Sequence, residues 1–116
     1  MAASPEATRL AAIGTDIAEI VALALGNPVV LDRFTRTAIL THQQAVDLGT
    51  LGYVTRASGL TTDVRHDHPH LPPPLPRTQH THTGGDVLAG FEARAEEIAN
   101  SITLITRYLD DLDNPD

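Results

Sequence analysis

The last third of the sequence carries the strongest periodic signal in the chain, and this signal limits the fold more than any other stretch. Apolar residues recur there at spacings that alternate between four and three, as in a heptad seam. They are Phe91, Ala95, Ile98, Ile102, Ile105, Leu109 and Leu112. At a rise of ~1.5 Å per residue, the pattern predicts a helix of roughly 40 Å over about residues 84–112. We expect Thr83 to cap it.

Start and stop signals predict a second long helix near the beginning of the sequence. Ser4 is a typical capping residue, and Pro5 takes the first helical position, where a missing N–H is tolerated. Apolar residues then recur at helical spacing until Gly26, which ends the helix. The sequence therefore predicts a helix over about 5–25, and we expect it to pack against the last helix.

Two short helices are predicted between the long ones. Asn27 and Pro28 repeat the signal of a cap followed by proline. Thr41 and Gln44 have the spacing of a capping box, and Gly49 is a typical C-terminal stop. The expected ranges are 28–34 and 41–48.

Residues 50–83 show little periodicity, and we expect one long connection there. Ser58 and Gly59 give a turn signal, and the prolines of 71–76 predict extended polyproline II backbone. We interpret this stretch as a surface loop between two helices; a proline-rich docking ligand is the alternative. The expected fold is mainly α, with two longer packed helices, two short helices and a long charged, proline-rich loop. It forms a single helical domain or fragment over 1–116.

The composition excludes several classes of protein. The net charge is -7 and there is no lysine, which argues against nucleic acid because phosphate neutralisation needs a basic surface. No apolar run is long enough to span a bilayer, and we see no signal peptide. Aromatic residues make up only 3%, so we expect a core of leucine, isoleucine, valine and alanine. The absence of cysteine excludes disulfides, iron–sulfur ligation and thiolate metal sites within this chain.

The loop contains a short run of mixed charge, together with a flexible Gly59 and a stiff Pro69. Its charged residues are Arg56, Asp63, Arg65 and Asp67, followed by His68. An irregular loop leaves backbone N–H and C=O groups unpaired, and charged side chains are natural partners for them. We therefore predict that these residues hold the loop in place, with each arginine on a carboxylate or a loop carbonyl. Arg94 and Glu97 of the last helix either pair with this loop or face solvent.

The same run makes the sequence similar to a known family. The likeness is carried by 52–60, 63–65, 67–69 and 85–87, with flanking matches before and after them. These segments resemble the large subunit of membrane-bound nickel–iron hydrogenases of the formate-hydrogenlyase type. The quinone-site large subunit of respiratory NADH dehydrogenase belongs to the same superfamily. The resemblance covers about 15–112 and marks a structural motif of Arg56, Ser58, Gly59, Asp63, Arg65, Asp67, His68, Pro69, Gly85 and Asp86.

The resemblance implies a middle segment of such a subunit or a degenerate relative, because the two cysteine pairs that hold the nickel–iron centre in hydrogenases are absent. It implies a structural scaffold around a redox or quinone site, not catalytic alone. Expected partners are an iron–sulfur small subunit and other subunits of a membrane-associated redox complex, with the chain in the cytoplasm and peripheral to the inner membrane. No cofactor is expected in this chain, and a nickel–iron centre only in a full-length relative. The alternative is a non-catalytic helical interaction or assembly module derived from that family.

The loop histidines are weak candidates for adventitious metal binding. They are His66, His68, His70, His80 and His82. Imidazoles suit zinc, copper and nickel, but Pro69 and the irregular loop disfavour a preformed tetrahedral site. Solvated loop histidines are therefore the favoured interpretation.

The apolar seam of the last helix is longer than the first helix can cover. An uncovered apolar strip of this kind marks interfaces. We therefore expect the isolated chain to form a homodimer through antiparallel last helices. The alternative is a monomer whose proline-rich loop folds back over the seam.

Overall fold

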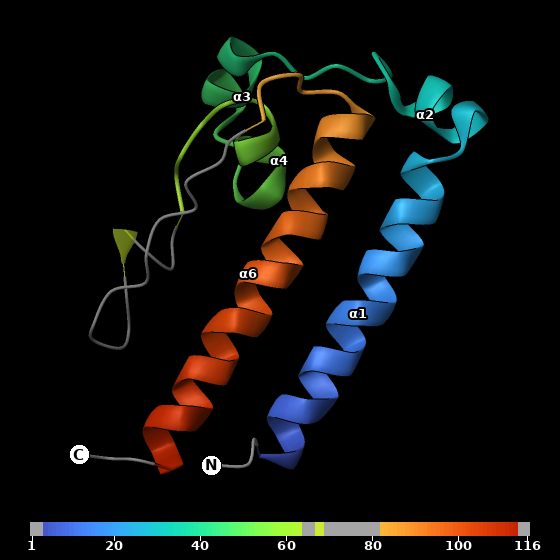
Figure 1. Ribbon diagram of the computed structural model, residues 1–116. Coiled ribbons are helices and arrows are strands. Elements are labelled where there is room, and N and C mark those ends of the chain that lie inside the picture. The colour runs from blue at the N-terminus through green and yellow to red at the C-terminus, as the bar shows by residue number, and fades with distance from the viewer. Residues whose placement is uncertain (1–3, 64–66, 69–81, 114–116) are drawn as a thin grey trace.

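The computed structural model describes residues 4–63, 67–68 and 82–113, and these residues form helices and connections without strands. The two long helices, α1 (Pro5–Leu25) and α6 (Val87–Asp113), lie side by side and run in opposite directions (Figure 1). Three short helices lie toward the end where α1 finishes and α6 begins: α2 (Pro28–Phe34), α3 (His42–Leu48) and α4 (Gly52–Ala57). The predicted mainly α fold with two longer helices is confirmed.

The predicted caps form where the sequence indicates them. The side chain of Ser4 accepts a hydrogen bond from a backbone N–H in the first turn of α1 (3.2 Å), and Asn27 caps α2 in the same way. Thr41 and Gln44 make both bonds of the capping box at the start of α3. Gly49 ends α3 in the left-handed conformation. Each N-cap satisfies N–H groups that the first turn leaves unpaired, so the local sequence sets where these helices begin.

The structure corrects the interpretation of residues 50–83, because this stretch contains the helix α4. No side chain caps α4, and its six residues include a glycine and two β-branched residues, so it carries no local signal. Packing on α6 holds it instead. The charged run therefore starts on a helix, since Arg56 lies in the last turn of α4. The proline-rich stretch, 71–76, lies outside the described residues.

The last helix begins at Val87, later than predicted, and its cap is Asp86 instead of Thr83. Oδ1 of Asp86 accepts a hydrogen bond from the Ala89 N–H (2.8 Å). The other oxygen, Oδ2, accepts from the Arg36 N–H (2.7 Å), a contact across 50 positions of sequence. One carboxylate thus joins the start of α6 to the chain that follows α2.

In the described part of the chain the expected alanines form the buried apolar core, together with buried polar residues, whereas the leucine, isoleucine and valine side chains expected there stay at least partly exposed. Among the described residues, the buried apolar ones are Ala7, Ala45, Ala57, Ala89 and Ala93. The last three lie between α4 and α6 and allow a close approach of these helices. The buried polar residues are Thr55, Arg56, Ser58 and Asp63. Large aliphatic side chains stay partly exposed because the molecule is thin, with a shortest dimension of 16 Å, little more than one helix with its side chains.

No single helix in the described part of the chain is long and apolar enough to cross a membrane. α1 and α2 meet that test only as a pair, and the chain bends by 86° between them.

Gly85 lies where two chain segments meet, and its surroundings leave no room for a side chain. Its N–H donates to the Ala57 carbonyl (3.0 Å), and its carbonyl accepts from the Leu40 N–H (2.7 Å). Its φ is 66°, and a Cβ placed on it would overlap the Leu40 carbonyl oxygen. We predict that Gly85→Ala lowers the free energy of unfolding by about 3 kcal/mol or more, because it adds backbone strain and a clash. Urea denaturation measures the change.

Gly49→Ala is the matched control for this prediction. Gly49 has a φ of 64°, but nothing lies within 4 Å of a Cβ placed on it. The free energy of unfolding of Gly49→Ala should therefore fall by only the ~1–2 kcal/mol that a left-handed backbone costs a residue with a side chain. Equal losses in the two variants would contradict the role given to the contact between Gly85 and Leu40.

Candidate functional site

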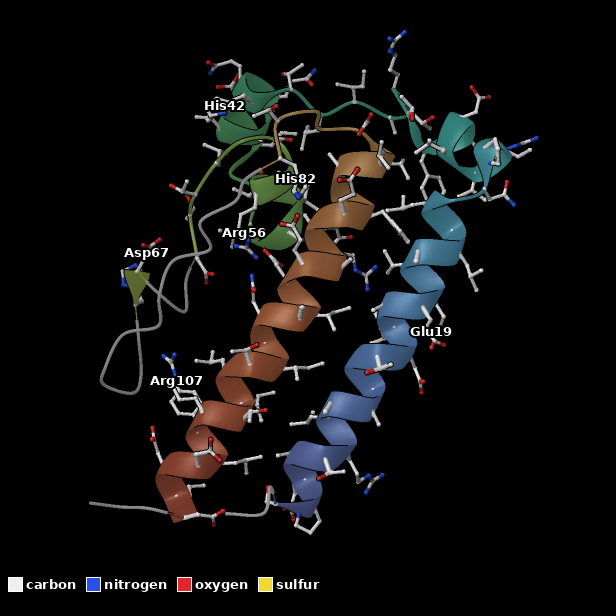
Figure 2. The ribbon with its side chains drawn as sticks, in the orientation of Figure 1. Glu19, His42, Arg56, Asp67, His82 and Arg107 are labelled. Atoms are coloured by element: carbon white, nitrogen blue, oxygen red, sulfur yellow. The ribbon has the colours of Figure 1, made fainter. Side chains whose placement is uncertain are left out.

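The charged motif contributes a buried polar junction between α4, α6 and the segments beside them. We call "the junction" the set of Leu40, Arg56, Ser58, Gly85 and Glu97. Arg56 is its centre, with a side chain only 8% exposed. Its Nε donates to Oε1 of Glu97 on α6, and its Nη1 donates to the Thr62 carbonyl (2.9 Å) and lies 4.0 Å from Oδ2 of Asp63. Figure 2 labels Arg56 beside α4.

Hydrogen bonds tie the end of α4 to distant parts of the chain. The Arg56 carbonyl accepts from the His82 N–H (3.2 Å), and the Ser58 hydroxyl donates to the Leu40 carbonyl (2.7 Å). Nδ1 of His42 lies 3.0 Å from the Ser58 carbonyl, which can only accept, so this nitrogen carries the proton. These bonds satisfy polar groups that are withdrawn from water, and they fix three segments against one another.

Hydrogen bonds also keep Asp86, beside the junction, in its charged form. The bond from the Ala89 N–H does most to lower the pKa of this carboxyl, and the bond from the Arg36 N–H acts in the same direction. Partial burial opposes them because it disfavours charge, but the pKa stays below its ordinary value. The carboxylate also stands at the positive end of the α6 dipole. A negative charge therefore anchors the start of α6 at neutral pH.

His82 lies between the junction and the acidic side of α6 (Figure 2). Its Nε2 is 3.2 Å from Oε2 of Glu96, and its Nδ1 is 3.9 Å from Oε2 of Glu92. The shorter contact is within ion-pair distance, but its angle does not make a hydrogen bond, and Nε2 bonds to no other described atom. Because the Glu96 side chain is 43% exposed, solvent screens this contact and it adds little stability.

A pocket of about 340 Å³ lies beside the junction, between α4 and the first turns of α6. Arg94 lines it, with its guanidinium carbon 5.1 Å from the centre of the Tyr53 ring. Phe91 also lines it and packs against Phe34 with ring centres 5.4 Å apart. Of the two helix residues considered for the charged loop, Glu97 pairs with it, whereas Arg94 makes a cation–π contact.

The structure brings some of the predicted site residues together and separates others. Those at or next to the junction are Arg56, Ser58, Gly59, Asp63, Gly85 and Asp86. Asp67 lies away from α6 (Figure 2), where its carboxylate accepts from the Asp63 N–H (3.1 Å), and His68 is exposed. Arg65, His66, Pro69, His70 and His80 lie outside the described residues. Sequence reasoning missed Leu40 and His42, because a backbone carbonyl and a ring packed near Gly59 leave no sequence signal.

The donor groups of this chain do not fit a nickel–iron or iron–sulfur centre. Such centres need thiolates, and the chain has no cysteine. Across 4–63, 67–68 and 82–113, no three histidine, aspartate or glutamate side chains are grouped so as to hold a metal ion. The chemistry of the junction is that of a brace, in which charged groups bind one another and the backbone.

Comparison with known proteins shows the family of the chain. The chain falls in a superfamily of oxidoreductase subunits that includes NADH dehydrogenases and a formate hydrogenlyase, as its resemblance predicted. It belongs to the family described as the 49 kDa subunit of respiratory-chain NADH dehydrogenase, which matches residues 7–116.

Three curated relatives show how much of such a protein the chain represents. It is 34% identical over 97 residues to an NADH-quinone oxidoreductase subunit of Deinococcus radiodurans, covering 83% of this chain and 24% of that protein. The match to an NADH-quinone oxidoreductase subunit of Phocaeicola vulgatus is 32% over 88 residues, covering 75% and 17%. The match to formate hydrogenlyase subunit 5 of Escherichia coli is 31% over 98 residues, covering 84% and 17%. The chain therefore spans at most about a quarter of these relatives.

We predict that the pair of Arg56 and Glu97 stabilises the fold. In Arg56→Ala, Glu97 and the Thr62 carbonyl lose their partner, and the free energy of unfolding should fall by about 1–3 kcal/mol. Arg56→Lys should recover only part of this loss, because an ammonium cannot reproduce the forked donors of a guanidinium. Arg107→Ala, at an exposed position on α6, is the control and should stay within about 0.5 kcal/mol of the wild type. Urea unfolding tests all three variants. If Arg56→Ala has the same free energy of unfolding as the wild type, the pair of Arg56 and Glu97 does not stabilise the fold.

Proposed function

We propose that this chain is a structural segment of the large subunit of a membrane-associated redox complex. In this role it frames the redox or quinone site of that subunit and is not catalytic alone. The proposal rests on the burial and the contacts of Arg56. Its buried charge is engaged by Glu97, by Asp63 and by a backbone carbonyl, whereas a group that exchanges protons with a substrate has to be within reach of that substrate.

The names of the relatives indicate what type of parent complex to propose for this chain. They are subunits of NADH-quinone oxidoreductases and of a formate hydrogenlyase. We therefore propose that the parent complex of this chain passes electrons to a quinone or to protons. Its nearest partner is proposed to be an iron–sulfur small subunit, with the chain on the cytoplasmic side and peripheral to the inner membrane.

A second candidate is a helical assembly module that kept the family scaffold and lost the chemistry. The exposed aliphatic side chains of α1 and α6 favour it, because such surfaces bind other proteins. The two candidates differ in one observable property. A structural segment remains in the mature complex, whereas an assembly module leaves it.

Deletion and complementation in the host test the proposal. Membranes from a strain without this chain should lose quinone-reducing or hydrogen-evolving activity, and the wild-type chain should restore it. Arg56→Ala should restore less, because α4 is no longer braced on α6. A tagged wild-type chain should purify with an iron–sulfur subunit. Normal membrane activity after deletion, or catalysis by the chain alone, would contradict the proposal.

We also predict that the purified chain holds no stoichiometric nickel or iron, because it offers no thiolate. Elemental analysis after washing with a chelator is the measurement. Zinc or nickel that the chelator removes is consistent with loose capture by histidines. One tightly held nickel or iron per chain would disprove this expectation.

A further inference from the structure

α1 and α6 approach closely and leave a groove along one face of the hairpin that they form. A Cβ placed on Gly14 of α1 would lie 3.1 Å from Cδ1 of Ile102 on α6. The groove has a volume of about 350 Å³, and every residue that lines it belongs to one of these two helices. Most of the lining is small, with Ala18 and Ala22 on α1 and Ala99 on α6. No other described element closes the groove.

Within the described part of the chain, much of the apolar surface of the two long helices stays uncovered. Among their large aliphatic side chains, Ile13, Ile20, Leu23, Ile105 and Leu112 are between 43% and 77% exposed. The molecule is little more than one helix deep. Helices with an apolar side are stable when a second layer of structure packs on them. The groove is the part of the surface already shaped to receive such a layer.

The shape of the groove selects its occupant. A concave strip between two helices accepts the convex ridge of side chains of a third helix, at interaxial distances of about 8–10 Å. Alanine and glycine in the lining leave room for large aliphatic side chains on that helix. A second copy of this chain would present the same concave strip, and two concave strips leave a void between them.

The charge of the two helices further limits which polypeptide can bind in the groove. α1 has three carboxylates and one arginine, and α6 has two arginines and six carboxylates, one of which is neutralised by Arg56 of α4, so a surplus of five negative charges remains. Glu96 is the charged residue in the groove lining, with a side chain 43% exposed, and Glu92 lies one turn before it. A basic residue on the flank of the occupant complements them. A second copy would bring the same negative surplus and be repelled.

We propose that this groove binds an amphipathic α-helix of another polypeptide segment. That helix carries large aliphatic side chains on the face that enters the groove, and lysine or arginine on the flank beside α6. The inference rests on the shape and charge of the hairpin and does not depend on the redox role proposed above.

Binding of a synthetic peptide to the full chain tests this inference. The probe is a fluorescent peptide of about 20 residues, a length that spans about 30 Å as a helix, with leucines on one side and lysines beside them. The matched peptide has glutamates in place of the lysines. By fluorescence anisotropy, the lysine peptide should bind in the micromolar range and the glutamate peptide at least about tenfold more weakly.

Groove variants locate the binding site. Ala18 and Ala99 lie at exposed positions on the two walls of the groove, so Ala18→Trp and Ala99→Trp fill it. Each variant should bind the lysine peptide about tenfold more weakly, or weaker still. Glu96→Gln should weaken it by about two- to fivefold. Ala12→Trp is the control, because Ala12 is exposed on α1 and does not line the groove. Circular dichroism verifies that each variant keeps its helices.

Three results would overturn the inference. The first is no binding of the lysine peptide, or equal affinity for the two peptides. The second is an Ala12→Trp variant that binds as weakly as the groove variants. The third comes from light scattering: a dimer of the free chain that Ala18→Trp dissociates would show that a second copy occupies the groove.

Discussion

The buried guanidinium of Arg56 is the constraint on which the rest of the structure depends. A charge in such a place is stable only with a counter-charge and acceptors around it, so Glu97 and the Thr62 carbonyl must hold their positions. This requirement fixes α4 on α6 in one register. α4 is short and uncapped, so it owes its helical state to that contact. The segment 82–86 and the residues before α3 are then placed by hydrogen bonds to the end of α4.

The distance along the chain between a signal and its partner decides what could be predicted. Ser4, Asn27 and Thr41 lie within three residues of the N–H groups that they cap, so the sequence alone locates three helices. Thr83 was expected to cap the last helix, whereas the bond from the Arg36 N–H to the Asp86 carboxylate joins residues 50 positions apart and leaves no local signal in the sequence. α4 has no local signal at all. The family resemblance located Arg56 as a structural residue, and Glu97 was one of two partners considered on the last helix.

The same reasoning explains why the buried core holds alanine but not the leucine, isoleucine and valine that were also expected there. Helical periodicity says which side of α6 is apolar, but not how many layers cover it. Ala57, Ala89 and Ala93 form the buried contact of α4 with α6, because only small side chains let the two helices come this close. A larger residue at any of these positions would push α4 outward and separate Arg56 from Glu97. Small residues and buried charges therefore depend on each other here, although they look unrelated in the sequence.

The pairing of α1 with α6 also sets an order of events during protein synthesis. α1 leaves the ribosome first, and residues 26–86, more than half of the chain, follow before α6 exists. Throughout that interval the side of α1 that will face α6, which includes Ile17, is open to water and to other nascent chains. Once α6 is complete, it can pair with α1 only if α1 has been kept apart from those chains. The contact between α1 and α6 is therefore a late step in folding, and it closes a loop of more than half of the chain.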